Sequence, residues 1–310
     1  NVAVGSGSLD ANTTGASNVA VGNNSMTANT NGYENTAVGK DSLASCTEGF
    51  ENTAIGHNCG AAITTGDNNT FVGNAAGQAN TTAGANTAVG NAALASNTTG
   101  ANNVAVGYAA LDSNTEGAQN TAVGWNSLRA TTTGSDNTAL GKRALDANTT
   151  ASSNTAVGTN AGLVITTGAA NTIVGSGAGQ NMTTAANCLI LGYEAGITGS
   201  PGGNLTTADN SIRLGDENIQ NAHIQVDWTV ASDQRDKTDF TDLDLGLDFV
   251  KELSPVTYKW DKRSNYGNKN ADDYDLNAQT PDGTHKEDWL DIGFKAQEVE
   301  ALEIAAGYNK

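Results

Sequence analysis

Ser232 and Lys237 are the two residues whose types and spacing best suit covalent chemistry. They lie five positions apart in the stretch Ala231–Lys237, which reads ASDQRDK. A serine hydroxyl is a weak nucleophile that needs a base, and a lysine serves as that base when burial lowers its pKa and leaves the amine neutral. The same two residues also suit a structural role, in which Ser232 caps a helix and Lys237 stays solvated. The spacing alone leaves both interpretations open.

No other set of residues has the spacing of a metal, nucleotide or glycan-cleaving site. The three histidines, His57, His223 and His285, are too scattered to hold zinc. The GGxGxD pattern of calcium-binding β-rolls is absent, and no phosphate-binding glycine loop lies between a strand and a helix. The acidic residues of the first two thirds occupy varied turn positions, which does not suit glycan hydrolysis. We therefore expect neither a metal nor a cofactor.

The charge balance excludes nucleic acid as a partner. The 310 residues carry 15 Lys and Arg against 33 Asp and Glu, a net charge of −18, whereas nucleic acid requires a field of positive charge. No stretch reaches the 18 apolar residues of a membrane helix. Asn1 opens in the middle of a repeated pattern, so we expect the chain to begin inside a longer protein. Three cysteines form no disulfide framework, and Cys59 is expected to be a small buried residue.

A 17-residue repeat fills the first two thirds of the chain. Its unit from Asn86 to Asn102 reads NTAVGNAALASNTTGAN. We number the columns of the repeat from its first Asn, which is unbroken from Asn1 to Asn171. The fourth column is always aliphatic and the thirteenth is always Thr over eleven copies. The fifth column is glycine in all twelve copies: Gly5, Gly22, Gly39, Gly56, Gly73, Gly90, Gly107, Gly124, Gly141, Gly158, Gly175 and Gly192.

Identical residues at a fixed interval predict a parallel β-solenoid. Each coil then stacks on the last at the spacing of neighbouring strands, about 4.8 Å, so that one column becomes one ladder of like side chains. Stacked Asn side chains can bond to one another, Thr suits a strand, and glycine closes corners that need a positive φ. A helical repeat is excluded because no apolar stripe with a 3.6-residue period exists.

The ninth column indicates which positions form a core. It holds Leu or Met in seven copies and Gly in five. Where it holds Gly, a larger side chain often occurs at another column of the same copy. Ile63, Ile165 and Met182 replace the usual residue of the twelfth column, and Phe71 replaces the Ala of the third. Such exchange of volume is what close packing requires. We therefore expect the aliphatic columns, the fourth included, to face an interior.

One 17-residue coil offers too little apolar area to offset the ordering of its chain. A core shared among parallel copies of the chain would supply the missing area. We therefore expect a homotrimer, with aliphatic side chains hidden between the chains.

The composition changes beyond the repeat. Gly199–Asn210 is rich in Gly, Pro and Asn and is expected to be a turn or linker. The patterns that follow predict strands at Ser211–Gly215, His223–Val230 and Pro255–Trp260, a helix at Leu243–Leu253, and a strand leading into a helix at Ile292–Leu302. The predicted organisation is a repetitive β shaft at 1–198, a shaft cap with linker strands at 199–231, and a small α+β domain at 232–310.

Two resemblances accompany these patterns. The NTAVG and NVAVG units are similar to the head repeats of trimeric autotransporter adhesins, which form trimeric β-rolls, and still more to the Asn/Thr/Gly repeats of phage tail fibres. The motifs SDQRDK, GLDFVKELSPVTYKW and GFKAQEVE, in this order from Ser232 to about Leu302, resemble the intramolecular chaperone domain at the C-terminus of phage endosialidases and other tail spikes and fibres.

The second resemblance implies an assembly function with self-cleavage. Members of that family bring three chains into register and then cleave themselves at the start of the domain by a Ser-Lys dyad. Carried onto this sequence, Ser232 and Lys237 are the dyad, the bond between Ala231 and Ser232 is cut, and Gln297 and Glu298 are candidates for supporting roles. The family usually continues into a long C-terminal helix, whereas this sequence stops at Lys310, so the domain is expected to be truncated.

The expected function is that of a structural virion protein, a homotrimeric phage tail fibre located outside the host cell. Its partners would be two identical chains, other tail or baseplate proteins, and a glycan or protein of the host surface. One alternative is a bacterial surface adhesin, although residues 232–310 lack the alternating strands of a membrane anchor barrel. A second is an ice-binding solenoid, suggested by the Thr ladder. A depolymerase enzyme has the least support.

Overall fold

The computed structural model describes residues 1–200, 202–219, 249, 251–259, 280–286, 288 and 291–305. The chain divides into two compact units, Asn1–Ile219 and Gln220–Lys310. The strand predicted at His223–Val230, most of the helix predicted at Leu243–Leu253, and both residues of the predicted dyad lie outside the described residues.

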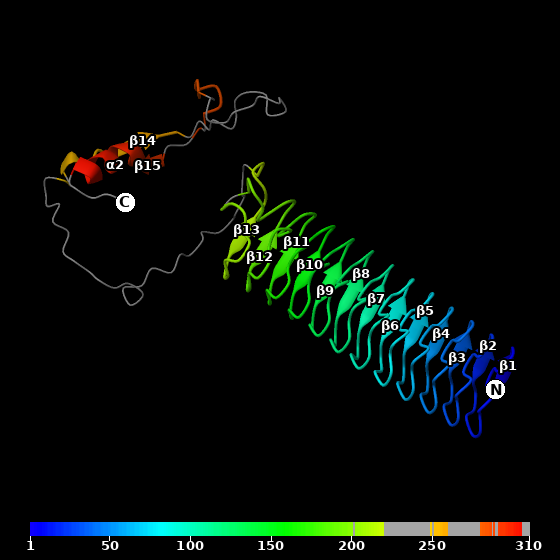
Figure 1. Ribbon diagram of the computed structural model, residues 1–310. Coiled ribbons are helices and arrows are strands. Elements are labelled where there is room, and N and C mark those ends of the chain that lie inside the picture. The colour runs from blue at the N-terminus through cyan, green and yellow to red at the C-terminus, as the bar shows by residue number, and fades with distance from the viewer. Residues whose placement is uncertain are drawn as a thin grey trace, which may run out of the picture. The chain divides into compact units, whose positions relative to one another are not determined.

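The first unit is a parallel β-solenoid, as the repeat predicts (Figure 1). Each coil contributes one three-residue strand, and the strands form a single 13-stranded sheet in sequence order. The strands are β1 Val2–Val4, β2 Val19–Val21, β3 Thr36–Val38, β4 Thr53–Ile55, β5 Thr70–Val72, β6 Thr87–Val89, β7 Val104–Val106, β8 Thr121–Val123, β9 Thr138–Leu140, β10 Thr155–Val157, β11 Thr172–Val174, β12 Leu189–Leu191 and β13 Ile212–Leu214.

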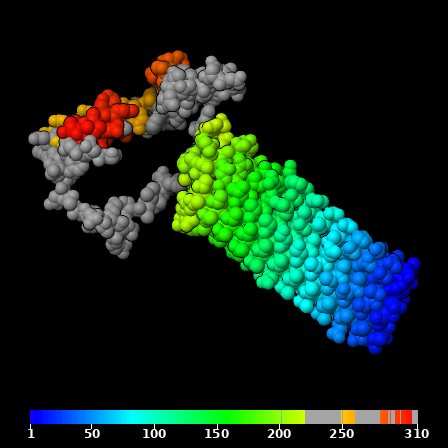
Figure 2. Space-filling view, viewed as in Figure 1, coloured from blue at the N-terminus to red at the C-terminus, as the bar shows by residue number. Residues whose placement is uncertain are grey.

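The register of the sheet follows the repeat column by column. Val2 in β1 pairs with Val19 in β2, and Ala105 in β7 pairs with Ala122 in β8. Eleven coils of 17 residues therefore lead from Val2 in β1 to Leu189 in β12. Like side chains stack along the axis, and the space-filling view shows a continuous rod over these coils (Figure 2).

The aliphatic fourth column, predicted to face an interior, does not face the interior of its own coil. Side chains alternate between the two faces of a strand. The first and third columns point inward, so Asn103 and Ala105 are fully buried, whereas Val104 and Val106 of the same strand are on the outer face. The small third column suits the narrow interior of a 17-residue coil, and the aliphatic fourth column is left partly exposed.

The exchange of volume predicted around the ninth column is confirmed. A Cβ built on Gly77 would overlap the ring of Phe71, and one built on Gly162 would lie 3.0 Å from both Ile165 and Ile173. Large side chains of the third and twelfth columns therefore occupy the space that the ninth-column Leu fills in other coils. All of these apolar side chains are fully buried.

The corners of the coil combine glycine with residues in the left-handed region. Gly90 has a φ of +141°, and a Cβ on it would clash with the carbonyl oxygen of Gly107 in the next coil. The fifth column is therefore restricted to glycine by both conformation and space. Non-glycine residues take positive φ at three other columns, exemplified by Ala92, Leu94 and Asn102.

Gly199–Asn210, predicted as a turn or linker, belongs to a further coil of the solenoid. Strand β13 pairs in parallel with β12, Leu189 lying opposite Ile212 after 23 residues instead of 17. Thr183 donates to the carbonyl of Thr206 in this longer coil, and Leu205 is buried in the core. The six extra residues therefore loop out without breaking the ladders.

The described part of the second unit is a small α+β arrangement. It consists of β14 Val256–Tyr258, β15 Asp291–Gly293 and α2 Ala296–Ala305. Strands β14 and β15 pair antiparallel, with Thr257 opposite Ile292. The predicted strand within Pro255–Trp260 and the predicted passage from strand to helix within Ile292–Leu302 are both present. Among the described residues, no helix has the length and hydropathy needed to cross a bilayer.

Candidate functional site

The motif GFKAQEVE spans the junction between β15 and α2. Gly293 is the last residue of β15, and a Cβ on it would lie 3.3 Å from the ring of Tyr258 in β14. The chain then turns at Lys295, whose carbonyl accepts bonds from the backbone N–H groups of Glu298 and Val299. The pairing with β14 ends at Gly293, and α2 begins three residues later at Ala296.

Gln297 and Glu298, the predicted supporting residues, lie in the first turn of α2 and are exposed. Lys295 Nζ lies 2.6 Å from Glu298 Oε1. A carboxylate in the first turn of a helix interacts favourably with the helix dipole, and this one also pairs with a lysine three residues earlier. The contacts of Glu298 are therefore those of a residue that stabilises the start of a helix.

Large apolar side chains are exposed around the same junction. Ile292 in β15, Phe294 just after it and Ile304 near the end of α2 are all exposed, Ile292 by 81%. Ile292 and Phe294 are two residues apart in extended chain, so they share one face. Apolar side chains at this exposure are suited to contact with another surface.

Comparison with known families bears on this part of the chain. A family model with the description "Chaperone of endosialidase" matches residues 232–308. The C-terminal segment thus matches the endosialidase chaperone family. The endosialidase chaperone segment covers 77 of the 310 residues and starts at Ser232, the first residue of the predicted dyad. Neither the curated proteins nor the solved structures that were compared with the chain gave a match.

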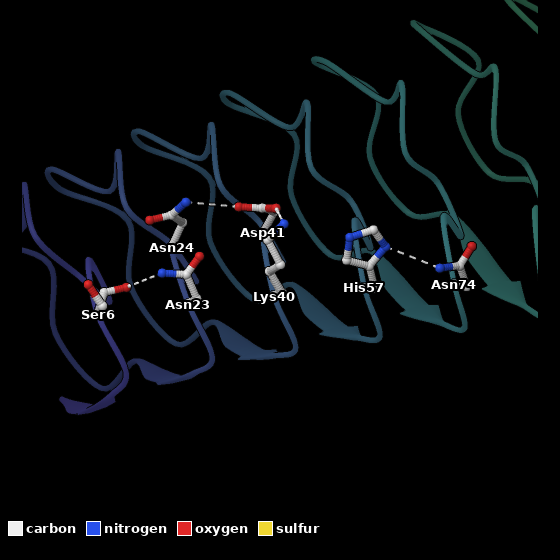
Figure 3. Close-up of polar contacts among 7 residues, drawn as sticks. All are labelled: Ser6, Asn23, Asn24, Lys40, Asp41, His57 and Asn74. Carbon is white, nitrogen blue, oxygen red and sulfur yellow. Dashed lines mark hydrogen bonds and ion pairs between the residues drawn. The ribbon is translucent and has the colours of Figure 1, made fainter.

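The exposed corner of the solenoid carries a row of polar side chains from neighbouring coils (Figure 3). Asn24 Nδ2 donates to Asp41 Oδ1 over 3.1 Å, and Lys40 Nζ lies 3.4 Å from Asp41 Oδ2. The hydrogen bond from Asn24 is the main cause that lowers the pKa of the Asp41 carboxyl. Further along, Asn74 Nδ2 lies 3.2 Å from His57 Nδ1. The two contacts made by Asn24 and Asn74 link one coil to the next. No metal-binding cluster of His, Cys, Asp and Glu occurs in the described residues.

Charged side chains form a second set of links in the middle of the shaft. Asp146 is almost fully buried, and its two carboxylate oxygens pair with Arg129 Nε at 2.7 Å and Arg143 Nε at 2.8 Å. Its carboxylate thus has a partner for each oxygen. Asp112, one coil before Arg129, has a raised pKa because of its burial. This arrangement compensates the buried charge of Asp146.

Aromatic residues of the shaft stack on neighbours within the same chain. The rings of Tyr33 and Phe50 are stacked with centroids 4.9 Å apart, and Lys142 Nζ lies 5.4 Å from the centre of the Trp125 ring. Tyr108 precedes Trp125 by one coil, and both are exposed. These residues occupy the sixth and sixteenth columns, at corners of the coil and away from its strand.

The cysteines are buried free thiols. Burial raises the pKa of Cys46 to about 11 and that of Cys59 to about 12. Such thiols are unreactive at neutral pH because the thiolate is the reactive form. Cys59 fills a column that other coils fill with Ala or Ser, so the prediction that it is a small buried residue is confirmed.

Proposed function

We propose that this chain is a trimeric bacteriophage tail fibre whose C-terminal segment directs the assembly of three identical chains. The observation that carries the proposal is the union, in one chain, of a parallel β-solenoid with a segment that matches the endosialidase chaperone family from its first motif onward. The solenoid supplies a long rigid spacer. A chaperone at its end suits such a shaft, because parallel coils of several chains must start in the same register.

The assembly role has support from exposed apolar groups in the described part of the segment. Ile292 and Phe294 are uncovered in the single chain. Contact with identical chains would remove them from water, which is the usual driving force of association. In this proposal the fibre belongs to the virion, joins other tail or baseplate proteins, and carries the surface that meets a glycan or protein of the host.

Self-cleavage between Ala231 and Ser232 is the second part of the proposal. Ser232 Oγ would attack the carbonyl carbon of Ala231 while neutral Lys237 accepts the hydroxyl proton. Lys237 would then pass this proton to the departing nitrogen of Ser232, so that the amide bond breaks and an ester and a free amine remain at Ser232. Water would then hydrolyse the ester, which restores the Ser232 hydroxyl. Support comes from the residue types, from their spacing, and from the start of the family match at Ser232.

The test is expression of the full-length protein, followed by intact-mass and native-mass measurements. We expect a particle of three chains, with each chain cut between Ala231 and Ser232. Ser232→Ala and Lys237→Arg should leave the chains uncut but still trimeric, and Thr238→Ala, the matched control, should be cut. An uncut parent protein would contradict the proposed self-cleavage, and a native mass of one chain would contradict the proposed trimer.

A further inference from the structure

The outer face of the 13-stranded sheet is a continuous surface of aliphatic and threonine side chains along the shaft. It consists of the second and fourth columns, the first and last residues of each strand, which point away from the core. We call it the outer strand face. Its second column is Val2, Val19, Thr36, Thr53, Thr70, Thr87, Val104, Thr121, Thr138, Thr155, Thr172, Leu189 and Ile212, and its fourth column is Val4, Val21, Val38, Ile55, Val72, Val89, Val106, Val123, Leu140, Val157, Val174, Leu191 and Leu214.

The composition of this face is uniform from end to end. Eight of its residues are threonines, and all the others are aliphatic: five in the second column and thirteen in the fourth. None carries a charge, although the chain has a net charge of −18. The shaft therefore keeps one strip free of charge while its acidic residues lie elsewhere on the coils.

Within the described part of the shaft, every large aliphatic side chain that is exposed between Asn1 and Leu214 lies on this face. Val123 is 37% exposed, Ile55 42% and Val4 56%. Soluble monomers rarely leave a long continuous apolar strip in water, and such strips usually mark an interface. The strip follows the strands that run in a single row along the solenoid in Figure 1.

The dimensions of the face suit another copy of the same chain. Twelve steps of about 4.8 Å give a length of roughly 58 Å, and a three-residue strand gives a width of about 10 Å. The resulting area, on the order of 600 Å² per chain, approaches the roughly 800 Å² per partner of a standard stable interface. Only a partner with the same repeat along the same axis can match this face coil by coil.

Electrostatics favours the same face for contact between copies. Two chains with a charge of −18 repel each other where their acidic residues meet. On the outer strand face this repulsion is smallest and the gain from apolar burial is largest. Sheets that pack face to face lie about 10 Å apart, so side chains of this size can fill the space between them.

We propose that three copies of the chain pack in parallel through their outer strand faces, which enclose a dry seam along the axis of the shaft. This inference rests on the trimer of the proposed function and names the surface that holds it along the shaft. The fourth column thus belongs to a core, but to one between chains and not within a coil.

The test uses single cysteines introduced into the full-length protein. Val123→Cys and Thr121→Cys each place a thiol on the outer strand face. The matched control is Ser96→Cys, a nearly isosteric substitution at an exposed residue outside the strands. The native Cys46, Cys59 and Cys188 are buried and give little background. The folded proteins are treated with a short bismaleimide, and the products are separated under denaturing conditions after the native mass is measured.

We expect a native mass of three chains, cross-linked pairs of chains for both face variants, and single chains for Ser96→Cys. A three-chain mass without cross-links at either face position, or with equal cross-linking at Ser96→Cys, overturns the inference while the trimer stands. A native mass of one chain overturns both. If that single chain also inhibits the growth of ice crystals, the regular Thr and aliphatic array of the face binds ice instead.

Discussion

Asn35 donates its backbone N–H to the side-chain Oδ1 of Asn18, one coil earlier, over 2.9 Å. The same bond recurs along the first column as far as the bond from Cys188 to Asn171. Each of these amides also donates through Nδ2 to a carbonyl of the fifteenth column, as Asn18 does to Gly32 over 2.7 Å. The buried Asn column therefore ties successive coils together where the strand begins.

Asn103→Ala should lower the stability of the shaft strongly. The change removes the acceptor of the Asn120 N–H and the donor to the Gly117 carbonyl, each at 2.9 Å. Buried groups left without partners cost about 1–3 kcal/mol each, so we expect a loss of about 2–5 kcal/mol, measured by denaturant unfolding. Asn102→Ala is the control, because Ala85 occupies the same column at a similar positive φ. Equal losses for the two variants would contradict the role of the ladder.

Thr131→Asn should stabilise the shaft. In the twelfth column, Asn114 Oδ1 is buried without a partner. Asn148 Nδ2 donates to the Ala151 carbonyl within its own coil, and its contact with the neighbouring coil is a 3.3 Å bond to the Thr131 hydroxyl. An asparagine at 131 can donate to Asn114 and accept from Asn148, as Asn97 does between its neighbours. We expect a gain of about 0.5–1.5 kcal/mol in the free energy of unfolding. Thr131→Val should destabilise instead, and an Asn variant as unstable as the Val variant would argue against the ladder.

Phe71 and Gly77 should show strong coupling in a double-mutant cycle. Phe71→Ala leaves a cavity and should cost about 3–5 kcal/mol. Gly77→Leu alone should also destabilise, because its side chain would overlap the Phe71 ring. The double variant restores the Ala and Leu of other coils, such as Ala88 and Leu94, so it should regain much of the loss. Strict additivity of the two unfolding free energies would show that the residues do not share one space.

The buried thiols should make the shaft less stable in alkali. Burial raises the pKa of Cys46 to about 11 and that of Cys59 to about 12, from an ordinary value of 9.0. Above pH 9 the unfolded chain loses these protons first, so the contribution present below pH 9 is lost as the pH rises through 11. Cys46→Thr with Cys59→Ala should weaken this loss between pH 8 and pH 11, measured as the unfolding midpoint relative to the parent. Parallel curves for the two proteins would contradict the assignment.

Particular residues show which features of the fold can be predicted from the repeat pattern of the sequence. The 17-residue spacing of Gly90 and Gly107 predicts both the solenoid and its register, because in-register stacking is the one arrangement that places like residues in one ladder. The exchange between Phe71 and Gly77 is also visible in the sequence, since volume must be conserved in a packed core. The 23-residue coil was missed because its extra Gly and Pro residues are typical of a linker.

The motif GFKAQEVE predicts its strand and helix, but it does not tell what Glu298 contacts. The ion pair with Lys295 depends on where α2 starts, and the motif does not mark that residue. The roles of Ser232 and Lys237 remain a prediction from sequence motifs and family resemblance.

The period, the ladders and the register follow from the amino-acid sequence, because each depends on which residues recur and how far apart they are. The structure was needed to show that Ala105 faces the interior of the coil and Val106 the outside. Both residues are apolar, so the polarity of their side chains does not tell which of the two points inward. The phase is set by where the coil bends inward, and several of those bends are made by residues such as Leu94, whose left-handed φ nothing in its side chain predicts.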